Sequence, residues 1–182
     1  MPTTEKSHTT KPAGSCCGNA APSPAEACGC SGPANKHPAP VIRQTTSEIT
    51  AKNRWDHFLA RWGVNRMGHI VTPGLYRLGN PNRDSPIFAS ANYTLSFDAL
   101  RSALAGRDAW ILVIDTKGIN VWCAAGKGTF GTGELIRRIA VTGLADVVAH
   151  RKIILPQLGA PGVCAHDVAR YSGFSVEYGP VR

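Results

Sequence analysis

The sequence predicts an α/β domain with a mainly parallel sheet, for three reasons. Residues 110–115 form a continuous apolar run that ends in an acid, which is typical of a parallel strand buried on both faces. Segments with strand and helix patterns alternate along much of the chain with short links. The 182 residues suffice for one domain with some chain left over. Ligands of such domains bind at the carboxyl ends of the strands.

The first predicted element is an amphipathic helix that ends at Gly63. Trp55, Phe58, Leu59 and Trp62 recur at i, i+3, i+4 and i+7, while the basic residues nearby fall elsewhere on the helical wheel. We expect these apolar side chains to pack in the core.

Strands and helices are then expected to alternate up to the C-terminus. Short apolar runs between turn residues predict strands at 75–79, 87–90, 110–115, 147–150, 153–155 and 174–178. Helical spacing predicts three further helices, which begin at a cap residue Ser96, near Thr132 and near residue 163.

Residues 1–48 are predicted to be a disordered tail, and residues 49–182 the folded domain. The tail is rich in Pro, Ala, Ser, Thr and Gly without apolar periodicity, so burial cannot offset the entropy of ordering it. Its cysteines match neither zinc nor iron–sulfur spacing, but thiols on a flexible chain can capture soft metal ions. Capture of soft metal ions is therefore one possible role of these cysteines, and the alternative is that they have no specific role. The four residues are Cys16, Cys17, Cys28 and Cys30.

Charge and hydropathy limit the classes of function. The formal net charge is +8, but the chain lacks a nucleic-acid motif, so no nucleic-acid partner is expected; an acidic protein or an anionic cofactor fits equally well. No run approaches the roughly 18 apolar residues of a membrane span, and the N-terminus lacks the apolar centre of a secretory signal. We therefore expect the chain as given to be cytoplasmic and without disulfides.

The glycine-rich segment that follows the 110–115 strand does not fit a nucleotide-binding loop. The segment contains the pattern G-x-G-x-x-G at Gly126, Gly128 and Gly131. However, ten residues separate Asp115, at the end of the strand, from Gly126, whereas the dinucleotide motif follows its strand directly. A P-loop is excluded because Lys127 is followed by glycine.

Cys123 lies within this segment, beside the bulky Trp122 and before Ala124-Ala125-Gly126. Such small residues let a large flat ligand approach the backbone. The alternative is a packed, inert thiol, because cysteine is a common core residue.

Residues 120–132, which read NVWCAAGKGTFGT, resemble the cap-helix motif of the mercury-methylating corrinoid proteins of the HgcA family. The resemblance extends over nearly all of residues 73–182, including Leu155–Gly162 and the closing Tyr178–Arg182. The same domain occurs, more distantly, in the large subunit of the corrinoid iron-sulfur protein of the acetyl-CoA pathway.

The resemblance implies a Rossmann-like domain with a cap helix that binds a cobalamin-type corrinoid, with Cys123 as the lower axial ligand of cobalt. The implied activity is that of a corrinoid-dependent methyltransferase, which passes a methyl group from methyl-cob(III)amide to inorganic Hg(II) and yields methylmercury. Methyl must leave with its electron pair, and an anionic soft donor stabilises the remaining Co(III) better than neutral imidazole. The residues implied to bind the cofactor are Ser90, Asn120, Val121, Trp122, Cys123, Ala124, Ala125, Gly126, Lys127, Gly128, Thr129, Phe130 and Gly131.

The resemblance also implies partners. Cobalt must regain two electrons after each transfer, for which the family uses a ferredoxin-like protein with two [4Fe-4S] clusters, and the methyl donor is linked to methyltetrahydrofolate. The family continues into a C-terminal membrane domain that is missing here, since the chain stops at Arg182, so we expect a fragment or a truncated protein. Two alternatives stay open: a methyl-transfer subunit of the acetyl-CoA pathway, and a non-catalytic soft-metal-binding protein.

The remaining candidates for chemistry form no predicted site. Cys164 is expected to be a buried or incidental thiol. Four histidines show no ligand spacing and are expected to be solvated or packed in the core. They are His57, His69, His150 and His166.

Overall fold

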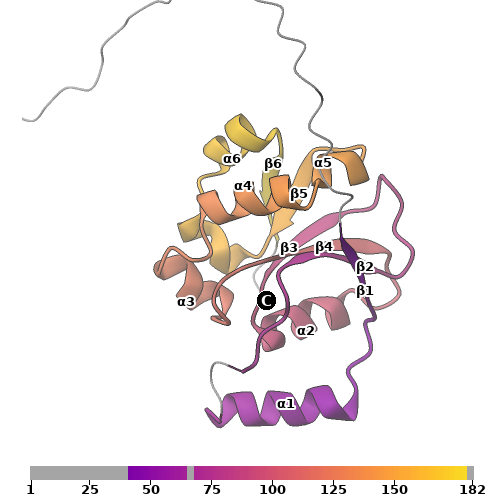
Figure 1. Ribbon diagram of the computed structural model, residues 1–182, viewed down its shortest axis with the longest axis vertical. Coiled ribbons are helices and arrows are strands. Elements are labelled where there is room, and N and C mark those ends of the chain that lie inside the picture. Colours follow the sequence, from indigo (N-terminus) through magenta and orange to yellow (C-terminus); the bar gives the residue numbers. More distant parts are fainter. Residues whose placement is uncertain (1–40, 65–67, 180–182) are drawn as a thin grey trace, which may run out of the picture. The chain divides into compact units, whose positions relative to one another are not determined.

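The computed structural model describes residues 41–64 and 68–179, so the predicted disorder of residues 1–40 lies outside the described part. A six-stranded sheet in the order β1-β2-β4-β3-β5-β6 lies between helices on both faces (Figure 1). All neighbouring strands are parallel except β2 and β4, which confirms the predicted α/β class. The strands are β1 Ile42–Thr45, β2 Gly74–Leu78, β3 Ile87–Ala91, β4 Ala109–Ile114, β5 Lys152–Leu155 and β6 Ser175–Tyr178. The helices are α1 Ala51–Arg61, α2 Thr94–Ala103, α3 Val121–Gly126, α4 Thr132–Val141, α5 Leu144–Val147, the 3₁₀ helix η1 Gln157–Gly162 and α6 Ala165–Ser172.

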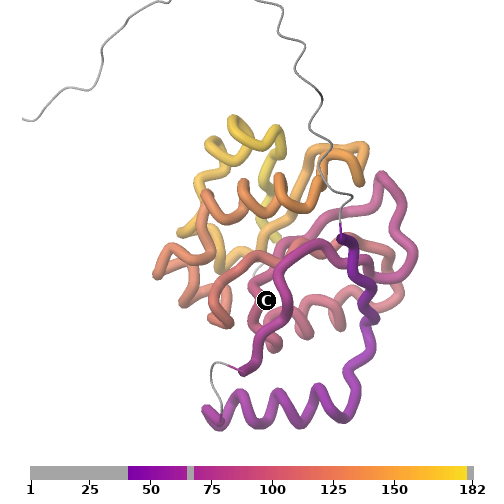
Figure 2. The backbone as a smooth tube through the Cα atoms, viewed as in Figure 1, coloured from indigo at the N-terminus to yellow at the C-terminus, as the bar shows by residue number. Residues whose placement is uncertain are grey.

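Strand β4 forms the centre of the core, as its apolar run predicts, because all six of its residues are buried. Side chains alternate between the two faces of a strand. Trp110, Leu112 and Ile114 pack in a cluster with residues of α3, α4 and α6. Ile111 and Val113 pack in a second cluster with residues of α2. The helices that follow β4 in the chain, coloured orange to yellow, therefore lie on the opposite face of the sheet from α2 (Figure 2).

Two predicted elements differ in the structure. Helix α2 begins two residues before Ser96, with Tyr93 rather than Ser96 in the capping position. The predicted strand at 147–150 is wrong: residues 144–147 form the short helix α5, after Gly143 in the left-handed region. Val148 is extended and fully buried, but it fills the core as a single residue instead of pairing in the sheet.

Strand β1 lies inside the segment predicted to be disordered, so the boundary at residue 48 is wrong. Residues 42–45 pair in parallel with residues 75–78 of β2. Arg101 fixes the chain that follows, because its buried guanidinium donates hydrogen bonds to the carbonyl oxygens of Thr46 and Glu48. Neither contact is local in sequence, so residue periodicity did not predict it.

Helix α1 forms where the apolar spacing predicts it, but its predicted role in the core is wrong. None of its residues is buried, and Trp55, Phe58 and Trp62 are exposed. Thr50 caps the helix and forms a capping box with Asn53, which stabilises the first turn without help from core packing.

Removing residues 1–48 is expected to destabilise the fold, whereas removing residues 1–40 should not. The longer deletion removes β1 and leaves the buried Arg101 guanidinium without two carbonyl acceptors, which costs at least about 2 kcal/mol. The melting temperature should fall by about 5 °C or more relative to a chain that begins at Val41. Equal melting temperatures for the two chains would contradict the role given to β1.

Candidate functional site

The carboxyl ends of the three parallel strands β3, β4 and β5 lie at the same edge of the sheet, where the fold class predicts a ligand site. Asn92 follows β3, the 115–120 loop follows β4 and leads into α3, and η1 follows β5. The loop residues are hydrogen-bonded to Asn92, and η1 packs closely against α3. These segments form the candidate site, which contains residues 120–131 of the predicted set.

Helix α3 is short, and its N-terminal cap fixes it. The side-chain oxygen of Asn120 accepts a hydrogen bond from the backbone N–H of Cys123 at 2.9 Å. Val121, Ala124 and Ala125 are buried against the sheet. The helix therefore presents its opposite side to solvent, namely Trp122, Cys123, Gly126 and Lys127.

Close packing against η1 explains why residue 125 of α3 is small. A Cβ atom built on Gly162 would lie 2.2 Å from the carbonyl oxygen of Phe130 and 3.1 Å from Cα of Ala125. A Cβ atom on Gly159 would lie 2.6 Å from the buried Phe130 ring. The two alanines thus face the protein interior, and the room for a ligand near the backbone lies elsewhere on α3.

That room lies at the C-terminal end of α3. A Cβ atom on Gly126 or Gly128 would meet no atom within 4 Å, so the chain leaves open space beside both backbones. Gly128 has φ +75°, the left-handed conformation that favours glycine, and it turns the chain away from α3. Gly131 then approaches the carbonyl oxygen of Gly128, with its built Cβ atom only 2.7 Å away.

Asn92 holds the loop that positions α3. Its side-chain oxygen accepts hydrogen bonds from the backbone N–H groups of Thr116 and Gly118, both at 3.0 Å. Its side-chain NH₂ donates to Asp115 at 3.1 Å. Asn92 is buried, so it is the internal partner of a loop that would otherwise leave backbone groups unpaired.

Glu134 fixes the same loop from α4. Its carboxylate accepts a hydrogen bond from the backbone N–H of Asp115 at 3.1 Å and ion-pairs with Arg137 and Arg138. Partial burial opposes ionisation of Glu134, but the hydrogen bonds from the two arginines outweigh it, and its pKa lies below the usual value. The carboxylate therefore stays charged and available as an acceptor at neutral pH.

Ser90 is separated from the rest of the predicted set. Its hydroxyl is buried and donates to the carbonyl oxygen of Ala91 at 3.2 Å. Its neighbours Ala89 and Ala91 belong to the cluster beneath α3, so alternation along β3 directs Ser90 to the opposite face of the sheet. The structure brings residues 120–131 together but does not bring the Ser90 side chain to them.

Cys164, His57 and His69 each have a polar partner within the domain. Cys164 is exposed, contrary to the buried thiol that was one expectation, and its backbone N–H donates to the Thr132 hydroxyl at 2.8 Å. His57 pairs with Asp98 at 2.7 Å, and the buried His69 pairs with Asp56 at 2.8 Å. Within residues 41–64 and 68–179, no group of three or more His, Cys, Asp or Glu residues is arranged to hold a metal ion.

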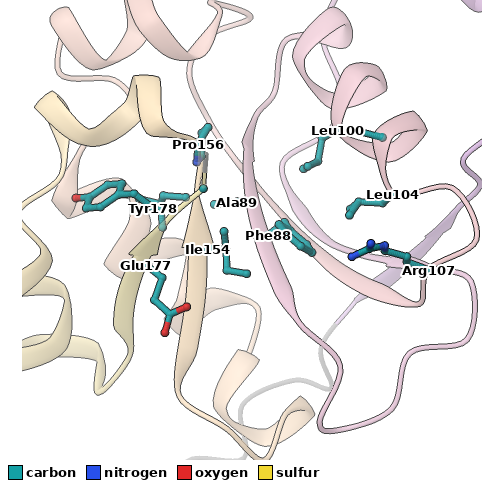
Figure 3. A pocket seen from close by; sticks show the side chains of 12 residues that line it. Phe88, Ala89, Leu100, Leu104, Arg107, Ile154, Pro156, Glu177 and Tyr178 are labelled. Carbon is teal, nitrogen blue, oxygen red and sulfur yellow. The ribbon is translucent and has the colours of Figure 1, made fainter. Parts of the chain in front are cut away.

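A cavity of about 530 Å³ lies away from α3, on the α2 face of the sheet (Figure 3). Helix α2 contributes Leu100 to it and Leu104 follows the end of that helix, while Phe88, Ile154 and Tyr178 come from strands β3, β5 and β6. None of residues 120–131 lines this cavity. In β5 Ile153 and Leu155 are buried but Ile154 is only part-buried, so this face of the sheet is incompletely covered, and the continuous apolar run of the strand gave no sign of it.

The fold is that of an α/β domain with a mainly parallel sheet, and comparison with known proteins identifies its family. Residues 65–173 match the family model described as CdhD: CO dehydrogenase/acetyl-CoA synthase delta subunit. The match covers more than half of the chain, so the protein belongs to this family.

Its curated relatives include subunits gamma of the acetyl-CoA decarbonylase/synthase complex. The protein of Methanopyrus kandleri is 38% identical over 112 residues, which are 60% of this chain and 24% of the relative. That of Methanocaldococcus jannaschii is 37% identical over 97 residues, 52% of this chain and 20% of the relative. That of Methanothermobacter thermautotrophicus is 28% identical over 159 residues, 76% of this chain and 34% of the relative. The chain thus spans between a fifth and about a third of the length of these proteins.

Proposed function

We propose that this domain binds a cobalamin-type corrinoid and acts in methyl transfer. The observation that carries the proposal is the Cys123 thiol, which is free and exposed on the open side of α3. The backbones at Gly126 and Gly128 are unobstructed, which leaves space for a flat macrocycle to approach them. A thiolate is a soft ligand suited to a transition metal. A bound corrinoid would supply a cobalt centre that accepts and releases methyl groups.

Different residues of the predicted set serve this site in different ways. Cys123 would supply a thiolate to cobalt, Trp122 would border the ring, and the Lys127 ammonium would offer a cation to an anionic group of the cofactor. Val121, Ala124, Ala125 and Phe130 are buried and hold α3 in place from behind. Asn120 keeps Cys123 in the first turn of the helix through its capping hydrogen bond.

We propose inorganic Hg(II) as the methyl acceptor and methylmercury as the product. Hg(II) is an electrophile, so the methyl group must arrive with its electron pair. An anionic ligand from Cys123 favours this polarity more than a neutral imidazole does. The two electrons lost in each turnover would come from a ferredoxin-like protein with two [4Fe-4S] clusters, and the methyl group from a methyltetrahydrofolate-linked donor.

A second candidate is methyl transfer in the assembly of acetyl-CoA. The family match and the names of the relatives favour this candidate over mercury methylation. The cap-helix motif around Cys123 is the feature that favours mercury. A third possibility, soft-metal capture by Cys16, Cys17, Cys28 and Cys30, concerns cysteines outside the described residues.

Reconstitution with cobalamin tests corrinoid binding, which both candidate functions require. The purified chain should retain a corrinoid absorption spectrum after gel filtration, and absence of bound corrinoid would overturn both. The methyl-loaded protein is then used in two separate assays. One contains Hg(II) and the reduced ferredoxin-like partner, and the other contains an acetyl-CoA synthase without mercury. Methylmercury formation supports the first acceptor. Transfer only to the synthase would overturn Hg(II) as the methyl acceptor and support methyl transfer in the assembly of acetyl-CoA.

A further inference from the structure

Helix α1 is oriented opposite to most surface helices, with its polar side toward the protein. His57 Nε2 lies 2.7 Å from Asp98 Oδ2 on α2, and Asp56 Oδ1 lies 2.8 Å from Nδ1 of the buried His69. The Val64 carbonyl, 2.9 Å from the other ring nitrogen, raises the pKa of His69, and Asp56 adds to this effect against the cost of burial. These polar contacts on its inner side attach α1 to the domain.

The outer side of α1 is an aromatic ridge. Trp55, Phe58 and Trp62 are 63%, 47% and 74% exposed. The ring of Phe58 lies 5.5 Å from each tryptophan ring, so the three side chains form one continuous apolar surface. Figure 1 shows α1 at the edge of the part of the chain that the structure describes, with no other described helix beyond it. A contiguous apolar surface in this position is typical of an interaction site.

Cations flank the aromatic ridge. On a helical wheel Arg54 and Arg61 fall along one side of the ridge and Lys52 along the other, and all three are exposed. The acidic residue of α1, Asp56, is turned inward to His69. The outer half of the helix therefore combines large aromatic side chains with positive charge.

We propose that α1 binds the surface of an anionic lipid bilayer and lies in the plane of the membrane, with the aromatic ridge at headgroup depth. Tryptophan is enriched at this depth because its ring is apolar and its N–H is polar. Arginine and lysine side chains reach from the helix flanks to lipid phosphates while their stems stay apolar. This proposal goes beyond the proposed function, and it requires no membrane span: among the described residues, no helix is long and apolar enough to cross a bilayer.

Charge favours a bilayer over a second copy of this chain. An isologous contact through the ridge would bring the Arg54 and Arg61 side chains of two copies close together, without an acidic residue on the outer side of α1 to neutralise them. Anionic headgroups neutralise the same residues. Each cation near such a surface strengthens binding by about fivefold.

Vesicle sedimentation with the full 182-residue chain tests the proposal. The chain should sediment with vesicles of phosphatidylcholine and phosphatidylserine, bind phosphatidylcholine alone much more weakly, and dissociate as salt increases. Tryptophan fluorescence should shift to the blue on binding. Trp55→Ser with Trp62→Ser should reduce the partition coefficient by more than about tenfold, and Arg54→Gln with Arg61→Gln should reduce it by about tenfold or more on the anionic vesicles.

Tyr171→Ser with Arg170→Gln provides the matched control, since Tyr171 is 65% exposed on α6 and both residues lie outside α1. This variant should bind vesicles like the unchanged chain, and circular dichroism should show equal melting for all variants. Absence of binding to anionic vesicles would overturn the proposal. Vesicle binding by the α1 variants that equals that of the unchanged chain would also overturn it. A third contrary result is an unchanged chain that does not bind lipid and forms a dimer in solution, which the Trp55→Ser, Trp62→Ser variant disrupts.

Discussion

Replacing Cys123 by alanine is expected to abolish methyl transfer while the fold persists. The side chain is exposed, and the hydrogen bond to Asn120 comes from the Cys123 backbone, so neither packing nor the helix cap is lost. Alanine is also a better helix former than cysteine. Loss of a metal ligand should reduce the rate by more than about a hundredfold, because changes in groups that only support a ligand already cost about 10- to 100-fold. The measurement is methylmercury formed per corrinoid bound.

Two further variants make the test specific. Cys164→Ala removes the other free, exposed thiol of the described residues and should keep the rate of the unchanged protein. Cys123→His should still bind corrinoid but transfer methyl poorly to Hg(II), since imidazole is neutral. If Cys123→Ala methylates mercury at the original rate and Cys164→Ala does not, Cys123 is not the cobalt ligand.

The sheet was predictable where burial leaves a simple pattern. Strand β4 is apolar at every position because both of its faces are covered, and its limits in the sequence and in the structure differ by one residue. Strand β1 was missed because it is a four-residue edge strand with alternating exposed and part-buried residues beside a Pro-rich segment. Its pairing with β2 depends on a contact more than thirty residues away, which local propensity cannot show.

Periodicity predicted helix α1 but not the direction of its apolar side. A spacing of three and four residues shows that the aromatic side chains share one side of a helix. It does not show whether that side packs against the same chain, and here His57 and Asp56 attach the opposite side to the domain. The prediction of core packing was wrong for this reason.

The sequence predicted the candidate site as a segment, and its role in binding a ligand stays a prediction. The structure adds the contacts that hold the segment and the open space beside Gly126 and Gly128. The small size of Ala125 has a different cause, the close approach of Gly162 in η1. Such distant contacts leave no periodic signal, and the same holds for Asn92, which lies 24 residues before Thr116.

Replacing Asn92 by alanine is expected to destabilise the domain strongly and to loosen the loop before α3. The change leaves the backbone N–H groups of Thr116 and Gly118 without their acceptor, and Thr116 is fully buried. Each unpaired buried group costs about 1–3 kcal/mol, so the free energy of unfolding should fall by about 3–5 kcal/mol. The melting temperature should fall by about 10 °C.

Asn82→Ala is the matched control. The Asn82 side chain also accepts two hydrogen bonds, from the Asp84 backbone and the Ser85 hydroxyl, but it does so in an exposed loop where water can replace it. We expect this change to cost less than about 1 kcal/mol. Equal melting temperatures for the two variants would contradict the role given to Asn92.

Hydrogen exchange separates a local from a general effect of Asn92→Ala. The amides of Thr116 and Gly118 should exchange faster by a larger factor than amides in β6, because the lost acceptor served the loop directly. Corrinoid affinity should fall as well, since this loop leads through Asn120 into the helix that carries Cys123. If corrinoid affinity stays unchanged while the two amides lose protection, the position of α3 does not depend on the loop, and η1 together with the Asn120 cap suffices to hold it.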